Sequence, residues 1–141
     1  MDPLLLLGTW DFRREIRDHH DGVEYIAYGR ARFIREDDGR ICWSEHGTLQ
    51  WASGSTPVSR TLFLVREDAP AVGSPASWRV TFEDGRDFHP WTVGAVDHLC
   101  GRDLYRGGIA APEEPARSWE LHWHVTGPEK NYTMHTTYSA S

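Results

Sequence analysis

The sequence contains little lysine and little cysteine. Its 15 basic residues include a single lysine, Lys130, and 21 acidic residues outnumber them, so the formal net charge is −6. Proteins that neutralise nucleic-acid phosphates have the opposite balance, and we expect no nucleic-acid partner. Two cysteines, Cys42 and Cys100, are too few for a disulfide framework and suit a reducing compartment.

Long apolar runs are also missing. No segment approaches the ~20 apolar residues of a membrane-spanning helix. The first seven residues, MDPLLLL, lack the basic start and the longer apolar stretch of a signal peptide. The sequence therefore predicts a cytoplasmic protein with no membrane partner.

The composition is that of a folded globular protein. The chain has 141 residues, of which 39% are hydrophobic and 26% are charged. This length suits one domain, and this balance excludes intrinsic disorder. We predict a single domain over residues 1–141.

Alternating apolar and polar residues dominate the chain, and no window of twelve residues shows a convincing helical period apart from a short turn at 2–7. Acidic clusters that contain glycine, at 18–22, 36–39 and 83–86, have the composition of hairpin turns. Pro90 limits a short extended piece at 86–91. Longer strands are expected at 9–17, 23–35, 41–51, 58–66, 77–83, 94–106, 118–126 and 131–138.

Consecutive strands joined mostly by short turns predict an all-β, antiparallel, up-and-down sheet. Closing such a sheet into a barrel removes its exposed edges. A barrel of about eight strands is either filled by its own side chains or holds one small ligand.

The strand faces predict a mixed interior. Over 9–17, Arg14 shares a face with Trp10 and Phe12, so it is expected to point inward with them. Over 94–106, neither face is clearly the core. An aromatic interior with a few polar groups is typical of a ligand cavity.

Gly8-Thr9-Trp10 resembles the Gly-x-Trp signature of the calycin barrels, the lipocalins and their relatives. Over nearly its full length, the chain is similar to a small bacterial lipocalin-like family of unknown function, through segments 29–33, 82–89, 98–105 and 123–132. The resemblance implies a calycin-type barrel whose Trp packs across the closed end. It implies no established activity.

We expect a small apolar or amphipathic organic molecule as the ligand in the lumen. Strand parity and size select the candidate contacts, which are Trp10, Phe12, Arg14, Tyr25, Phe33, His89, Trp123 and Tyr132.

An alternative is a cofactor-free enzyme, a cyclase or isomerase, acting on an enclosed substrate. His98, Asp103 and Tyr105, together with Arg14, could meet inside the barrel as proton-handling groups.

Metal or haem binding is a second alternative, although we expect no cofactor. His98 and Cys100 lie two residues apart on one strand and, with His89, could ligate zinc. His89, His98 or His135 could serve as the axial ligand of a haem.

One further feature has a simpler interpretation. His122-x-His124 followed by Glu129 resembles a cupin metal motif, but the match stops there, and both histidines lie opposite the Trp123 face. We expect them on the solvated outer face.

A plain interaction module is the third class of function. Its outer aromatics would include Trp43, Trp51 and Trp91. A homodimer is a further alternative, because barrels of this size often pair through their outer faces.

Overall fold

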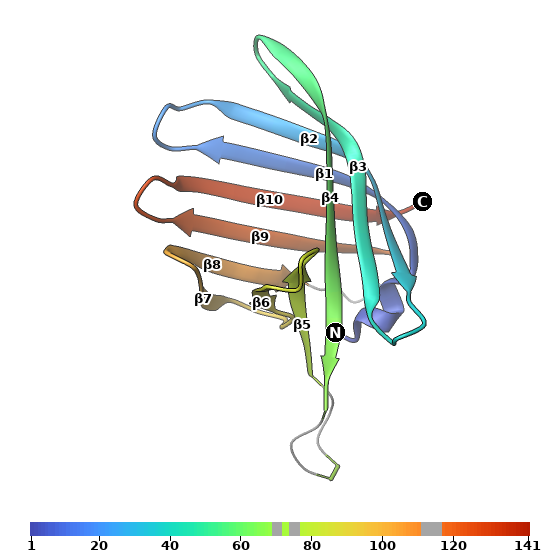
Figure 1. Cartoon of the computed structure of the whole chain (residues 1–141). Coiled ribbons are helices and arrows are strands. Elements are labelled where there is room, and N and C mark those ends of the chain that lie inside the picture. Colours follow the sequence, from blue (N-terminus) through green and yellow to red (C-terminus); the bar gives the residue numbers. More distant parts are fainter. Residues whose placement is uncertain (69–71, 74–76, 111–116) are drawn as a thin grey trace.

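The ten strands in the described part of the chain belong to one antiparallel sheet, which curls into a nearly closed barrel (Figure 1). The computed structural model describes residues 1–68, 72–73, 77–110 and 117–141. The order in the sheet is β6-β5-β4-β3-β2-β1-β10-β9-β8-β7, and the two end strands lie against each other. The strands are β1 (Gly8–Asp18), β2 (Glu24–Arg35), β3 (Ile41–Trp51), β4 (Gly54–Glu67), β5 (Ser77–Phe82), β6 (Asp87–Pro90), β7 (Val96–Cys100), β8 (Asp103–Ala110), β9 (Ser118–Thr126) and β10 (Asn131–Ala140).

The all-β antiparallel barrel expected from the sequence is confirmed, but the expected number of about eight strands is wrong. The extended piece at 86–91 contains a true strand, β6, which pairs with β5. The expected strand 94–106 is a hairpin, because Gly101 adopts φ 63° and reverses the chain between β7 and β8. A residue with positive φ can reverse the chain here at little cost in conformational energy only if it is glycine, because glycine has no Cβ atom.

A short 3₁₀ helix, η1 (Pro3–Leu6), precedes the barrel, as the turn expected at 2–7 predicted. The Asp2 carboxylate caps it by accepting a hydrogen bond from the Leu4 backbone N–H at 2.9 Å. Leu6 is fully buried in the core. No helix in the described part of the chain is long and apolar enough to cross a membrane.

Aromatic side chains fill the narrow end of the barrel. Trp43, Trp119 and Tyr138 are fully buried, and the rings of Trp119 and Tyr138 stack with centroids 4.0 Å apart. Trp10 of β1 packs edge-on against Trp119 with ring centroids 6.4 Å apart, and its indole Nε1 donates to the Leu6 carbonyl at 2.7 Å. Such close ring packing leaves little room for a ligand here.

The expectation that Trp43 and Trp91 lie on an exposed outer face is wrong. Trp43 shares the inner face of β3 with Ile41 and Glu45, and it is completely buried. Trp91 is 6% exposed, and its indole donates to the Met1 carbonyl at 2.9 Å.

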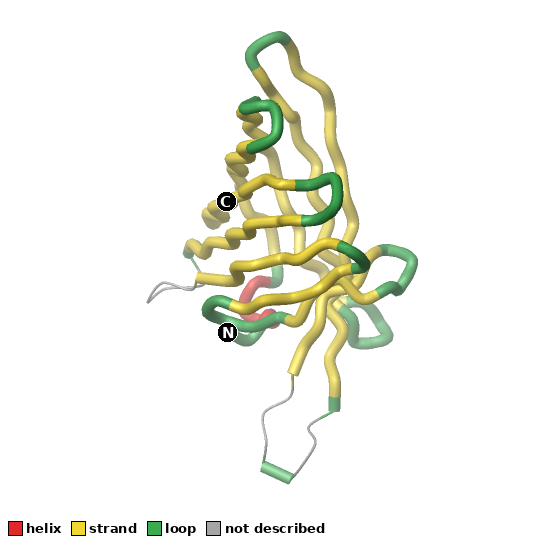
Figure 2. The backbone as a smooth tube through the Cα atoms, turned by 90° about the vertical axis from the view of Figure 1, so that its left-hand side faces the viewer, coloured by secondary structure: helices red, strands yellow, loops and turns green. Residues whose placement is uncertain are grey.

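The opposite end of the barrel is wider and less filled. There the hairpin β3–β4 rises above the rest of the sheet, and the hairpin tips spread apart (Figure 1 and Figure 2). Inward-facing side chains near these tips, including Ile16, Tyr25, Trp51 and Met134, are only half-buried. Because the core ends before the strands do, the molecule keeps an unfilled space at this end.

Candidate functional site

A hollow of about 1090 Å³ lies at the wide end of the barrel. The strand registers align one inward-facing residue from each of five strands along its wall. In sheet order these residues are Tyr25, Ile16, Met134, Trp123 and Gly107. Trp51 of β3 joins this row, because its ring lies 6.2 Å from the ring of Tyr25. The inner side of the hollow is therefore largely apolar and aromatic.

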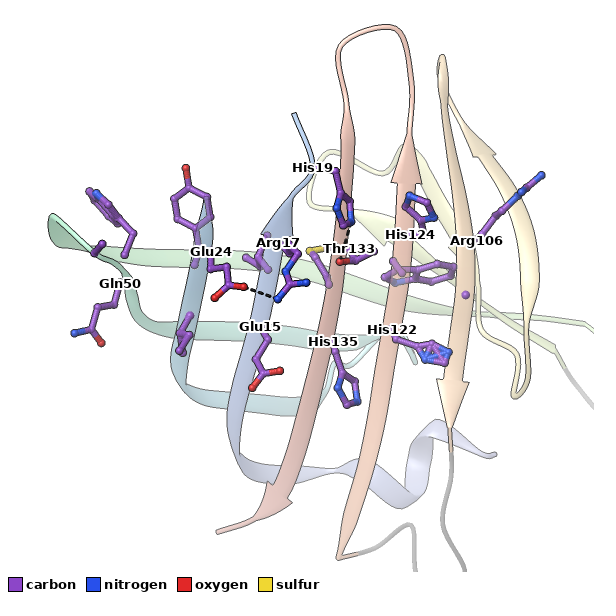
Figure 3. Close-up of a pocket in the computed structure, with 18 residues that line it drawn as sticks. Glu15, Arg17, His19, Glu24, Gln50, Arg106, His122, His124, Thr133 and His135 are labelled. Atoms are coloured by element: carbon purple, nitrogen blue, oxygen red, sulfur yellow. Dashed lines mark hydrogen bonds and ion pairs between the residues drawn. The ribbon is translucent and has the colours of Figure 1, made fainter. Parts of the chain in front are cut away.

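The same hollow is also bordered by residues of the outer face. Figure 3 shows Glu15 and Arg17 of β1 beside His135 of β10, with His122 and His124 of β9 further along the sheet. All five side chains are exposed. His122 and His124 thus lie on the solvated face, as strand alternation predicts.

A buried ionic network crosses the lumen below the hollow. The guanidinium of Arg14 donates from Nη2 to both carboxylate oxygens of Glu45 at 3.0 and 3.2 Å and to the Tyr138 hydroxyl at 3.1 Å. Its Nε donates to Thr136 Oγ1 at 2.9 Å. Arg60 of β4 donates from Nε to Glu45 Oε1 at 2.6 Å.

Two guanidinium groups face one carboxylate in this network. Burial disfavours the ionised form of Glu45, but Arg60 and Arg14 outweigh that effect and lower the pKa of its carboxyl to about 2. Burial, and then the Glu45 charge, raise the pKa of Tyr138, so its hydroxyl stays neutral and donates to Glu45 at 2.6 Å. With two cations, one anion and a neutral phenol, the network carries a net charge of +1.

A second cavity, of about 10 Å³, lies between this network and the hollow. Arg14, Arg60 and Thr136 line it, and it shares Trp123 and Met134 with the hollow. Such a volume holds about one water molecule. The two side chains that belong to both cavities therefore separate the apolar hollow from the charged network.

His89 also lines the small cavity, on the side of β6. It is 3% exposed, its ring lies 4.9 Å from that of Trp123, and its Nδ1 is 2.9 Å from the Pro90 carbonyl oxygen. Burial first, and then the charges of Arg60 and His98, lower the pKa of His89 to about 4. The imidazole is therefore neutral at pH 7, and Nδ1 carries the proton that bonds to Pro90.

The predicted ligand contacts fall into two groups. Tyr25 and Trp123 line the hollow, while Arg14 and His89 line the small cavity. Tyr132 is half-buried on the inner face of β10. The remaining three, Trp10, Phe12 and Phe33, are buried in the filled narrow end and line neither cavity.

The residues predicted to handle protons lie on the β7–β8 hairpin. The turn at Gly101 brings His98 directly opposite Tyr105, which is buried. Asp103 lies at the end of this hairpin, where Lys130 donates to its carboxylate at 2.8 Å. Arg14 is engaged by Glu45 instead, so the structure does not gather these four residues into one cluster.

The residues considered for metal or haem binding are dispersed. Within the described ranges, no group of three or more His, Cys, Asp or Glu side chains is arranged to hold a metal ion, and His89, His98 and Cys100 form none. His135 is exposed on the outer face, 3.5 Å from Glu120, and does not point into the lumen.

Glu45 and Arg60 are the site residues that sequence reasoning missed. Both stand on the inner face of their strands, Glu45 two residues after Trp43 and Arg60 two residues before Leu62. Extending the alternation along 41–51 and 58–66 would have placed an opposite charge beside the inward Arg14. The charge pairs join residues of different strands, so the sequence of one strand alone does not reveal them.

Comparison with known proteins places the chain in a family. A family model described as a family of unknown function, DUF6314, matches residues 6–140. The chain belongs to the DUF6314 family. No curated protein matches this DUF6314 member. A solved structure described as EF1p2_mFAP2b bound to DFHBI is 14% identical to the DUF6314 chain, with a TM-score of 0.48. The match covers 98% of the DUF6314 chain and 95% of the chain in that structure.

Proposed function

We propose that this DUF6314 protein binds a small amphipathic organic molecule at the wide end of its barrel. The apolar part of the ligand would rest on Tyr25, Ile16, Met134 and Trp51. Calycin-type barrel architecture belongs to this proposal too, supported by Gly8-Thr9-Trp10 and by the burial of Trp10 at the narrow end.

One observation carries the proposal. The inward-facing apolar residues of the wide end are half-buried beside a hollow of about 1090 Å³, although the same strand faces are fully packed at the narrow end. Polar residues of the outer face also border this hollow. Ligand sites are typically concavities of this size with mainly apolar walls and a few polar groups. A barrel that served only as a structural module would gain stability by filling this space.

The direct experiment is native mass spectrometry of the protein purified from its own host, compared with the mass of the denatured chain. We expect an additional mass of a few hundred daltons that is lost on denaturation, which corresponds to a ligand that such a hollow can hold. A bare chain, together with no enhancement of the fluorescence of the neutral dye Nile red, would argue against a binding barrel.

A matched pair of substitutions identifies the face that binds. Met134 faces inward and Thr133 faces outward at neighbouring positions of β10, and both border the hollow. Met134→Trp would fill the inner space and is expected to weaken Nile red binding at least about tenfold, whereas Thr133→Trp leaves it within about twofold. The reverse result would place the ligand on the outer face and contradict the lumen proposal.

A cofactor-free acid–base enzyme is the second candidate, because His98 lies opposite Tyr105 on the inner face of the β7–β8 hairpin. Incubation of the protein with a ligand it binds, followed by chromatography and mass spectrometry, separates the two candidates. A new isomer or cyclised product that disappears with His98→Ala would favour the enzyme. An unchanged ligand favours binding alone.

A further inference from the structure

The charged network contains two cations, Arg14 and Arg60, but only Glu45 as their anion. Glu45 balances one guanidinium, and its two oxygens already accept hydrogen bonds from Arg14, Arg60 and Tyr138. The second guanidinium charge therefore has no buried counter-charge among the described members of this network. A buried excess charge is costly unless an opposite charge or water reaches it.

Arg60 is the cation that another molecule can reach. Its side chain is 31% exposed, whereas the side chains of Arg14 and Glu45 are 11% and 3% exposed. The reason lies in the sheet: β5 pairs with β4 only from Leu62 onward, so the first half of β4, which carries Arg60, has no β5 ladder beside it.

The excess charge lies next to the apolar hollow. The small cavity lined by Arg60 shares two lining side chains with the hollow, Trp123 and Met134. Met134 is half-buried, and its unbranched side chain can change rotamer at low cost. The end of a hydrocarbon chain bound in the hollow would therefore face Arg60.

We propose that the ligand is an anionic amphiphile whose carboxylate binds Arg60 while its apolar part fills the hollow. This inference rests on the proposed binding function and specifies the class of ligand. A carboxylate would match the planar guanidinium and bring the network to neutrality. The neutral His89, which also lines the small cavity, adds no competing charge.

The test compares two probes that share an apolar chain, dodecanoate and dodecanol, by displacement of Nile red at pH 7.5. We expect wild-type protein to bind dodecanoate about tenfold to a hundredfold more tightly than dodecanol, the range of one charged hydrogen-bonded contact. Arg60→Gln should abolish that preference while leaving dodecanol affinity within about twofold. Arg60→Lys, which keeps the charge, should retain part of the preference.

Arg32→Gln is the matched control, because Arg32 is an exposed arginine on the outer face of β2 and its loss changes the net charge equally. A preference for dodecanoate that survives Arg60→Gln, or falls equally with Arg32→Gln, would overturn the assignment to Arg60. Equal displacement by both probes in the wild type would overturn the anionic class but leave the binding function standing. Failure of Nile red and of both probes to bind would reject the binding function and the inference with it.

Discussion

Single residues in this barrel have opposite roles according to the side of the strand on which they stand. Arg14 and Arg13 are neighbours, yet Arg14 is buried in the ionic network, whereas Arg13 is exposed in a pair with Glu15 at 3.6 Å. Exposed pairs of this kind contribute little to stability. The inward pair differs, because loss of one partner leaves a charge inside the protein.

Glu45→Gln is therefore expected to lower the free energy of unfolding by about 3–5 kcal/mol at pH 7, since it leaves the buried Arg14 and the partly exposed Arg60 without an anion. Because the folded pKa of Glu45, about 2, lies below its ordinary value of 4.5, this stabilisation is fully present above about pH 5. It decreases as the pH falls from 4.5 towards 2. Urea denaturation of both proteins from pH 7 to pH 2 measures the difference.

Glu15→Gln provides the control for this titration, because the Glu15 side chain is 62% exposed. Its free energy of unfolding should stay within about 0.5 kcal/mol of wild type at every pH. A Glu45→Gln difference that does not change between pH 5 and pH 2 would show that the Glu45 carboxyl does not ionise within the network.

At the scale of elements, two glycines oppose each other where β2 pairs with β3. Gly29 pairs with Gly47, and a Cβ on Gly47 would lie 2.1 Å from the Tyr28 carbonyl oxygen. A Cβ on Gly29 would lie equally close to the His46 carbonyl oxygen. The backbones of β2 and β3 thus leave no room for a side chain at either glycine, and glycines of this kind often mark a close approach or bend in a barrel sheet.

Gly47→Ala should consequently destabilise the protein by about 2–3 kcal/mol, because the added methyl group collides with backbone that cannot rotate away. Thermal or urea denaturation measures the change. Ser59→Ala, at an exposed site of β4 paired to His46, should change stability by less than about 0.5 kcal/mol. A Gly47→Ala protein as stable as wild type would mean that the strands can separate here without penalty.

For the whole molecule, the barrel has a seam where β6 meets β7. Each of these strands has a hydrogen-bonded ladder on one side, towards β5 and β8 respectively, whereas β1 is paired on both sides. The parallel bridge from Val93 to Ile109 holds the preceding loop against β8. The seam is thus the least constrained part of the described wall.

Amide hydrogen exchange should reveal this seam. Alternate amides of β7, those that point away from β8, are expected to exchange at least about tenfold faster than the amides of β1, because water reaches them without unfolding the sheet. Exchange followed by NMR resolves the alternation. Uniform protection of β7 equal to that of β1 would indicate a ladder between β6 and β7 and a fully closed barrel.

Much of the fold was predictable from alternation and turn residues. The strands at 41–51 and 118–126 have the predicted bounds, and the inward direction of Trp10, Phe12 and Arg14 follows from a period of two. The strand count was not predictable, because the sequence of 94–106 predicts one strand that continues through Gly101. Whether a glycine extends a strand or reverses it depends on its backbone conformation, and that is set by pairing with other strands.

The sequence by itself determined that Trp10, Phe12 and Arg14 share one inward face, because side-chain direction is local and repeats every second residue. Only the tertiary structure decided which inward residues meet. Barrel closure and register brought Glu45 of β3 and Arg60 of β4 to Arg14 of β1, and left Asp103 with Lys130. The tertiary structure also decided that aromatic side chains fill the narrow end and leave the wide end open, because the distance between facing strands sets the space that side chains must fill.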